Sequence, residues 1–359
     1  MRVQPFIAEP LPRSEPLDEQ FDDKMLRRRA VSVAGVLGVV VLVAWLAPGL
    51  GDVRSILEEA DPAWLAVAVA LEGLSCISYV VMFKPVFCEH MSWRSAYDLG
   101  MSELAMGSLI PASGAGGLAL GAWALRKGGM PAGDIARRSV AFFALKSAAN
   151  FVAVAVVGVL MFAGVGPSFS PLLTILPAGL AVVSILAVVG MALGLHRREV
   201  ATRERSRRSA AIAKGVEALG DGLTEAGQIL RKRDWRVIVG SLGYWAFDNA
   251  VLWACFMALG DSPAFTVVLM GYLLGQLGGL LPIPGGIGGI DGGLIGTMVV
   301  YGVPVAVAAA AVLAYRLILF WLPLIVGAHA YARLRRGLND PNRPDLCDPM
   351  VLARPAPTA

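Results

Sequence analysis

Long apolar runs, separated by short polar or basic stretches, make up most of the chain. Six of them have the length that crosses a bilayer as a helix, about 17 to 25 residues. They lie at about residues 30–47, 63–83, 139–163, 171–195, 237–259 and 305–332. The pattern predicts an all-α fold, a polytopic membrane helix bundle.

Two further apolar segments are broken by proline and glycine, and neither part of either segment is long enough to cross alone. Proline removes a backbone donor and clustered glycines disfavour helix. A helix that enters at Tyr97 is therefore expected to break at Pro111, and one that enters at Phe265 to break at Pro282. Each segment then predicts a re-entrant helical hairpin, with its outgoing helix starting after Gly117 or Gly293.

The two broken segments share their spacing, which indicates an internal duplication. Each has a glycine four residues before its first proline and another eleven before it, and each ends at Gly-x-Pro, with Pro131 in the first and Pro304 in the second. Basic residues flank only the first hairpin, so the two hairpins are expected to enter from opposite faces. This inverted repeat is the plan of secondary transporters. Two loops, or ordinary helices packed through glycine, are the alternative.

Charge then predicts the organisation of the chain across the cell (cytoplasmic) membrane. Lys and Arg gather between alternate spans, which places these segments and both termini in the cytoplasm. We expect a cytoplasmic tail at 1–29, a membrane domain at 30–336 and a disordered tail at 337–359. Within the membrane domain the first repeat covers about 63–163 and the second about 237–332.

The basic loop at 196–236 contains an apolar stripe at helical spacing. The stripe is formed by Ile212, Val216, Leu219, Leu223 and Leu230. It predicts an amphipathic helix that rests on the anionic inner leaflet or on the bundle. Docking of a membrane enzyme is the alternative.

Composition supports a membrane protein over a soluble enzyme. Apolar residues make up 56% of the 359 positions and charged residues 16%, with a mean hydropathy of +0.65. The net charge of +4 is confined to short blocks, so no nucleic-acid-binding face is expected. Four cysteines and three histidines are scattered along the chain, so we expect neither a metal site nor a cofactor, and no nucleophile has a base at catalytic spacing.

Several motifs resemble a known family. The strongest is Leu281-Pro-Ile-Pro-Gly-Gly-Ile-Gly288 followed by Asp291, and further matches are Gly302-Val-Pro304, Tyr315-Arg316, Trp321-Leu-Pro323, Pro111 to Gly117 and Leu125-Arg126. In these motifs the chain, from about 30 to 336, resembles the membrane region of lysylphosphatidylglycerol synthases and related stand-alone flippase-like proteins. Asp291 stands where that family usually has Glu. The resemblance implies lipid translocation or lipid binding, without the aminoacyl-transferase domain of the synthases.

Charged residues inside apolar spans are costly and mark candidate sites. Arg316, Lys146 and Asn150 are expected to contact the phosphate of an anionic lipid, because Arg offers a bidentate fork and Lys a point charge. An ion pair of Lys146 with Glu72 or Asp248 is the alternative. The buried acids, which also include Glu103 and Asp291, are equally compatible with proton binding and with fixed ion pairs.

The glycine-rich turns complete the expected substrate site, because they supply backbone N–H groups to an anion. The turn residues in this set are Pro111, Gly114, Gly116, Gly117, Pro282, Pro284, Gly285, Gly286 and Gly288. Together these residues favour a lipid flippase that moves an anionic phospholipid or a polyprenyl-linked lipid. A lipid-binding accessory protein of a membrane synthase or glycosyltransferase is the alternative, and a membrane-embedded transferase is a third possibility.

Overall fold

The computed structural model describes residues 51–109, 115–195, 207–261, 263–276, 289–340 and 346–347, with three isolated positions before them. Every regular element in these ranges is a helix. The expected span at 30–47, the tail at 1–29 and the tips of the two broken segments lie almost wholly outside the described residues. Of the predicted disordered tail at 337–359, the structure describes 337–340 and 346–347, where Leu346 is buried and donates its N–H to the carbonyl oxygen of Gly128.

The helices follow the predicted order of two repeats. The first repeat consists of α4 (Pro62–Phe87), α5 (Trp93–Leu109), α6 (Ala115–Lys127) and α7 (Ala132–Phe162). The second consists of α10 (Trp235–Ala258), α11 (Phe265–Gly275), α12 (Gly289–Val300) and α13 (Val305–Leu338). Outside them lie α3 (Gly51–Glu58), α8 (Pro171–Leu195) and α9 (Arg207–Arg231).

Four described helices are long and apolar enough to cross a membrane, namely α4, α7, α8 and α13. The predicted span in α10 is long enough, at 24 residues, but its hydropathy is lowered by Asp248 and Asn249. Both of these polar residues are buried inside the protein. The chain is therefore a multi-pass membrane protein, and α10 turns its polar residues toward the other helices.

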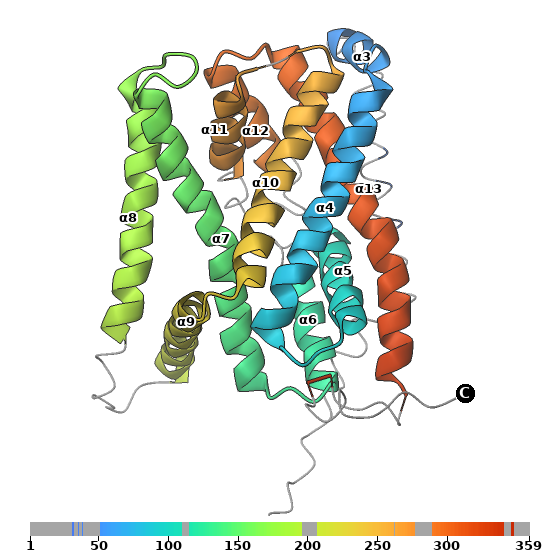
Figure 1. Cartoon of the computed structure of the whole chain (residues 1–359), viewed down its shortest axis with the longest axis vertical. Helices are drawn as coiled ribbons and strands as arrows, with labels where there is room; N and C mark the ends of the chain where they lie inside the picture. Colours follow the sequence, from blue (N-terminus) through green and yellow to red (C-terminus); the bar gives the residue numbers. More distant parts are fainter. Residues whose placement is uncertain are drawn as a thin grey trace, which may run out of the picture.

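The two broken segments enter from opposite ends of the bundle. In Figure 1, α5 and α6 lie in the lower half, while α11 and α12 lie in the upper half. The helices α6, α11 and α12 have 13, 11 and 12 residues, so none of them spans a bilayer. This is the arrangement expected of an inverted repeat of re-entrant hairpins.

The predicted starts of the outgoing helices were wrong. Helix α6 begins at Ala115 and α12 at Gly289, so Gly117 and Gly293 lie within the first turns. A Cβ atom at Gly117 would lie 2.6 Å from the carbonyl oxygen of Glu103 in α5, and one at Gly293 would lie 2.6 Å from that of Gly275 in α11. These glycines allow each pair of short helices to pack closely, and they do not end the turn.

The residues that follow the hairpin form the same turn in both repeats. Gly129 and Gly302 have positive φ angles of 93° and 89°, which only glycine adopts readily. Each donates its N–H to the carbonyl three residues earlier, and the next residue donates to the carbonyl five residues earlier. Pro131 and Pro304 then serve as the N-caps of α7 and α13. The shared Gly-x-Pro spacing in the sequence is thus a shared backbone conformation.

The first helices of the two repeats, α4 and α10, lie side by side along most of their length (Figure 1). A Cβ atom at Gly240 in α10 would lie 2.7 Å from the Cβ of Met82 and 2.8 Å from the carbonyl oxygen of Ser78, both in α4. Matching N-caps begin these helices at opposite ends: Asp61 accepts the N–H of Ala63, and Asp234 accepts that of Arg236. The repeats are therefore joined along the α4–α10 contact.

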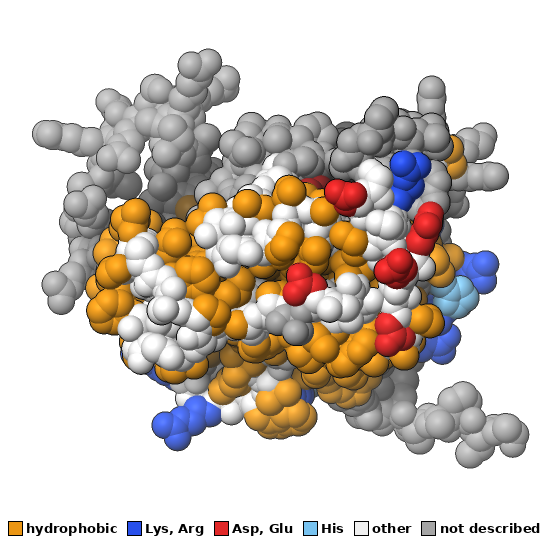
Figure 2. Space-filling view, turned by 90° about the horizontal axis from the view of Figure 1, so that it is seen from above, with side chains coloured by type: hydrophobic (Ala, Val, Ile, Leu, Met, Phe, Trp, Pro, Cys, Tyr) orange, Lys and Arg blue, Asp and Glu red, His pale blue; other side chains and the backbone are white. Residues whose placement is uncertain are grey.

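Charge is distributed unevenly between the two ends of the bundle. Figure 2 looks onto the end that carries α3, where acidic side chains are exposed and most Lys and Arg lie at the margin. The exposed acids of this end include Asp52, Glu58, Glu59 and Asp61. The opposite end, which we call the basic end, carries Lys84, Arg94, Lys127, Arg231 of α9 and the arginines that end α13. This asymmetry agrees with a cytoplasmic basic end.

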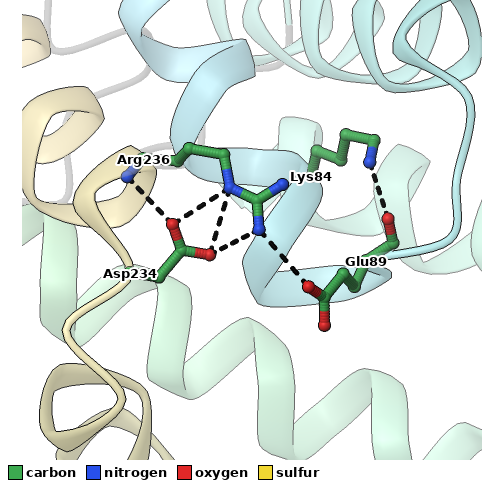
Figure 3. Close-up of polar contacts among 4 residues, drawn as sticks. All are labelled: Lys84, Glu89, Asp234 and Arg236. Carbon is green, nitrogen blue, oxygen red and sulfur yellow. Dashed lines mark hydrogen bonds and ion pairs between the residues drawn. The ribbon is translucent and has the colours of Figure 1, made fainter.

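At the basic end an ion-pair network joins the end of α4 to the start of α10 (Figure 3). The guanidinium of Arg236 bonds both oxygens of Asp234 and lies 3.5 Å from a carboxylate oxygen of Glu89. Lys84 donates to the carbonyl oxygen of Glu89 at 2.6 Å. Hydrogen bonds from Arg236 hold the pKa of Asp234 below its usual range.

The predicted amphipathic helix corresponds to α9, which packs against α7 at the basic end. Glu225 of α9 forms ion pairs with Arg137 and Arg138 of α7. A Cβ atom at Gly222 would lie 2.4 Å from the Cβ of Val140 in α7. The absence of a side chain at Gly222 therefore allows the two helices to approach closely. The bundle itself is therefore one binding partner of this helix.

We predict that Gly240→Ala lowers the free energy of unfolding by about 1–3 kcal/mol, because the new methyl group overlaps backbone atoms of α4. The matched control is Gly73→Ala, whose Cβ would meet nothing within 4 Å. That variant should be as stable as wild type or up to about 1 kcal/mol more stable. Thermal unfolding of the purified protein in detergent measures both, and equal melting temperatures for the two variants would contradict the packing assignment.

A second prediction concerns Asp234. Replacement by Ala removes the N-cap and the ion pair and should cost about 1 kcal/mol near pH 7, whereas Asn keeps a cap and should cost less. Because the folded pKa is lowered, the carboxylate stabilises the protein fully above its unfolded pKa of about 3.9. That stability is lost as pH falls through the folded pKa. Below about pH 4 the Asn variant should lose less stability than wild type, which melting curves across that range would show.

Candidate functional site

A cavity of about 240 Å³ lies where α7 of the first repeat meets the four helices of the second. It is lined by Lys146 and Asn150 of α7; Tyr244, Trp245 and Asp248 of α10; Tyr272 and Gln276 at the end of α11; Ile290 of α12; and Tyr315, Arg316 and Leu319 of α13. The lining is polar on several sides although the surrounding helices are apolar. A polar cavity inside a membrane bundle is a candidate site by default.

Asp248 of α10 lines this cavity and is buried. Its carboxylate accepts a hydrogen bond from the hydroxyl of Tyr315 at 3.1 Å and a short one from the hydroxyl of Tyr272. The two rings meet edge to face, with centroids 6.4 Å apart. A buried carboxylate needs such donors, and here they join α10 to α11 and α13.

Arg316 links the second hairpin to the last span. Its Nε donates to the carboxylate of Asp291, which lies in the first turn of α12. The Nη2 of the same guanidinium is buried and has no hydrogen-bond acceptor among the described residues. The Nε of Arg316 therefore connects α13 to α12, and its Nη2 can still donate a hydrogen bond to a ligand.

Lys146 has a different environment. Its ammonium nitrogen lies 5.6 Å from the ring centroid of Phe143, 5.7 Å from that of Tyr244 and 6.0 Å from that of Tyr79. No carboxylate oxygen of the described residues lies within 4 Å of this nitrogen, the distance that defines an ion pair. Aromatic faces stabilise a cation without neutralising it, so Lys146 contributes a positive charge to the cavity.

The sequence pattern of the lysylphosphatidylglycerol synthase transmembrane region matches residues 32–327. A UPF0104 membrane protein of Methanothermobacter thermautotrophicus is 29% identical over 335 residues, covering 86% of this chain and 94% of that protein. A UPF0104 membrane protein of Methanocaldococcus jannaschii is 34% identical over 112 residues, which cover 30% of this chain and 33% of the relative.

The chain belongs to the lysylphosphatidylglycerol synthase transmembrane region family. The expected family is thus confirmed over most of the chain. The relatives' descriptions name a membrane protein and no activity, so the movement of a lipid belongs to the proposal below.

In this family member the structure brings several predicted site residues together. Lys146 and Asn150 line one cavity with Arg316 and Asp248, although they come from three helices far apart in sequence. Asp291 joins them through its pair with Arg316. Arg316 forms a direct ion pair with Asp291, whereas Lys146 forms none among the described residues but lies within electrostatic range of Glu103 and Asp248.

Other predicted residues do not line the cavity, although Glu103 lies within electrostatic range of Lys146 and Glu72 within that of Asp248. Glu103 is buried within the first hairpin, where it accepts a hydrogen bond from Tyr79 at 2.8 Å. Glu72 is buried in α4 beside Cys76. Gly116 and Gly117 are buried in α6 and do not line the cavity. The remaining turn residues lie outside the described ranges, and they are Pro111, Gly114, Pro282, Pro284, Gly285, Gly286 and Gly288.

The aromatic part of the cavity was not predicted. Tyr244 and Tyr272 carry no charge and lie in apolar spans, where aromatic residues are common. The spacing did contain one signal, because Tyr244 and Trp245 precede Asp248 by four and three residues and so share its helix face.

We predict that Tyr315 and Asp248, which share a hydrogen bond, are energetically coupled in their contributions to stability. Tyr315→Phe and Asp248→Asn should each lower the free energy of unfolding by about 1–3 kcal/mol. The double variant should lose less than the sum, by about 0.5–3 kcal/mol.

The control for this cycle pairs Tyr315→Phe with Tyr301→Phe. The hydroxyl of Tyr301 donates to the carbonyl of Leu173 at 2.7 Å, away from Asp248. These two effects should add within about 0.5 kcal/mol. Denaturation in detergent measures both cycles, and simple additivity in the first would mean that the two groups do not interact.

Proposed function

We propose that this protein binds the phosphate-bearing headgroup of an anionic membrane lipid in the central cavity and moves the lipid between leaflets. The observation that carries the proposal is the excess of donors over acceptors in the cavity. Lys146 has no carboxylate partner among the described residues, and two buried donors lack an acceptor among them, Arg316 Nη2 and Trp245 Nε1.

An unpaired buried donor costs about 1–3 kcal/mol, so a ligand rich in acceptor oxygens would be stabilised here. Phosphate offers such oxygens and suits both an Arg fork and a Lys ammonium. The oxygens of Asp248 already accept hydrogen bonds from two tyrosine hydroxyls, so they do not compete for these donors. The unused hydrogen-bonding capacity of the cavity therefore suits an anion rich in acceptor oxygens.

The size and position of the cavity favour a lipid. At about 240 Å³ it is smaller than the roughly 300–1,000 Å³ of pockets that enclose a whole small molecule. A headgroup fits this space while the acyl or polyprenyl chains remain in the bilayer. The enclosing helices belong to both repeats, and rocking of one repeat against the other exposes such a site to each side in turn.

Transport is favoured over chemistry by the lining itself. None of the described lining residues is Ser, Cys, Thr or His, and the one carboxylate that lines the cavity is held by two hydroxyls. We place the basic end in the cytoplasm on the charge asymmetry of the two ends. A lipid-binding accessory role is the second candidate, and the amphipathic helix α9 is the feature that suggests it. This helix is bound to α7 of the same chain through Glu225.

The test is leaflet exchange of fluorescent phosphatidylglycerol in liposomes that contain the purified protein. Wild type should accelerate exchange over protein-free vesicles, and Lys146→Gln should slow it about 10- to 100-fold, as expected for loss of a charge-assisted hydrogen bond of about 1.5–3 kcal/mol. Lys146 is a sharper choice than Arg316, because its removal breaks no direct ion pair among the described residues, whereas Arg316 is paired with Asp291.

The matched control is Lys232→Gln, the same change at an exposed position near the basic end. It should exchange lipid at the wild-type rate. Parallel assays with a fluorescent polyprenyl phosphate and with phosphatidylcholine distinguish the two anionic lipid classes from a neutral one. Exchange at the protein-free rate for both anionic lipids, by a protein that melts normally, would refute the proposal.

A further inference from the structure

A second and larger cavity, of about 490 Å³, lies at the basic end between the start of α5 and the end of α13. It is lined by Arg94, Ser95, Asp98, Arg333, Arg336 and Gly337. Arg333 follows Arg316 by 17 residues on α13, which is about 25 Å along a helix. This cavity is therefore separate from the central one.

The walls of the second cavity are held in place. The guanidinium of Arg333 donates to Asp98 through Nε at 3.0 Å and through Nη2, and it lies over the ring of Tyr97 at 5.7 Å. Asp98 is buried. Further along the same contact, Gly327 of α13 leaves no room for a side chain against the backbone of Met101 in α5. The α5–α13 contact thus fixes the positions from which the arginines project.

The charge of the cavity is unbalanced. Three guanidinium groups face one carboxylate, so the lining carries a net charge of +2 (3 − 1). Arg333 is paired with Asp98, whereas neither Arg94 nor Arg336 has a carboxylate of the described residues within ion-pair distance. Both have exposed side chains. Two guanidinium forks on opposite walls match the oxygens of a phosphate group.

The position of the cavity indicates which kind of phosphate-bearing ligand can reach it. Trp93, which precedes Arg94, is 50% exposed, and Trp235 at the same end is 66% exposed. Exposed tryptophans at the end of a membrane bundle lie at the headgroup level. Basic pockets between helices on the cytoplasmic side suit anionic headgroups.

We propose that the cavity formed by Arg94, Arg333 and Arg336 is a binding site for a phosphate group, supplied by the headgroup of an anionic lipid in the leaflet at the basic end. A soluble phosphate has the same chemistry and is distinguished by the test below. The site does not depend on transport through the central cavity, so either proposal stands if the other fails.

The test uses native mass spectrometry of the full chain in neutral detergent, titrated with dioctanoyl phosphatidylglycerol, dioctanoyl phosphatidylcholine or inorganic phosphate. Arg94→Gln/Arg336→Gln removes two charges and leaves the Arg333–Asp98 pair intact, so the fold should be preserved. The control, Arg231→Gln/Lys232→Gln, removes two charges from exposed positions outside the cavity. All proteins also carry Lys146→Gln, so that binding in the central cavity is weakened equally.

We expect the parent and the control to retain phosphatidylglycerol in preference to phosphatidylcholine, and the cavity variant to bind phosphatidylglycerol at least 10-fold more weakly. Displacement of the lipid only by a large excess of inorganic phosphate would support a lipid headgroup as the ligand. Loss of inorganic phosphate binding in the cavity variant, without any loss of lipid binding, would keep the phosphate site and overturn its lipid source. Equal binding of both ligands by the cavity variant and the control would overturn the site itself.

Discussion

A helix that stops inside a bilayer leaves backbone N–H and C=O groups without partners, and lipid cannot satisfy them. Protein must therefore enclose each break. Here α5 with α6 and α11 with α12 form two such breaks from opposite ends, and the longer helices surround them (Figure 1). The need to enclose the breaks explains why the hairpins pack through Gly117 and Gly293, and why polar side chains gather between the repeats.

The same constraint governs the charges of the central cavity. Each buried charge has found a different form of compensation. Asp248 receives two tyrosine hydroxyls, Arg316 receives Asp291, and Lys146 receives three aromatic faces. The tyrosine hydroxyls and the aromatic faces each stabilise a charge without cancelling it. The cavity consequently holds charges of both signs, whose interactions a low-dielectric interior strengthens.

The basic end applies the same chemistry nearer to water. Ion pairs there lie at helix ends: Arg236 pairs with Asp234 at the start of α10 (Figure 3). Arg333 near the end of α13 pairs with Asp98 near the start of α5. The effect of these pairs is to orient arginines, and α13 carries arginine groups at both depths, at Arg316 and at Arg333. One helix therefore connects the surface cavity to the central one.

The amino-acid sequence by itself determined the membrane class, the repeat and its opposed orientation, because these follow from local properties: run length, the breaking of helices by proline and glycine, and the position of basic residues. It also singled out Lys146, Asn150, Asp248 and Arg316, since charge and strong polarity are costly in an apolar span. Tertiary structure alone decided which partners they have. Asp291 rather than a more central acid pairs with Arg316, and Tyr272 and Tyr315 hold Asp248, because partner choice depends on distances between helices that no linear spacing encodes. The roles of Gly117 and Gly293 were likewise decided by packing, since a glycine that ends a helix and one that admits a neighbouring helix look alike in a sequence.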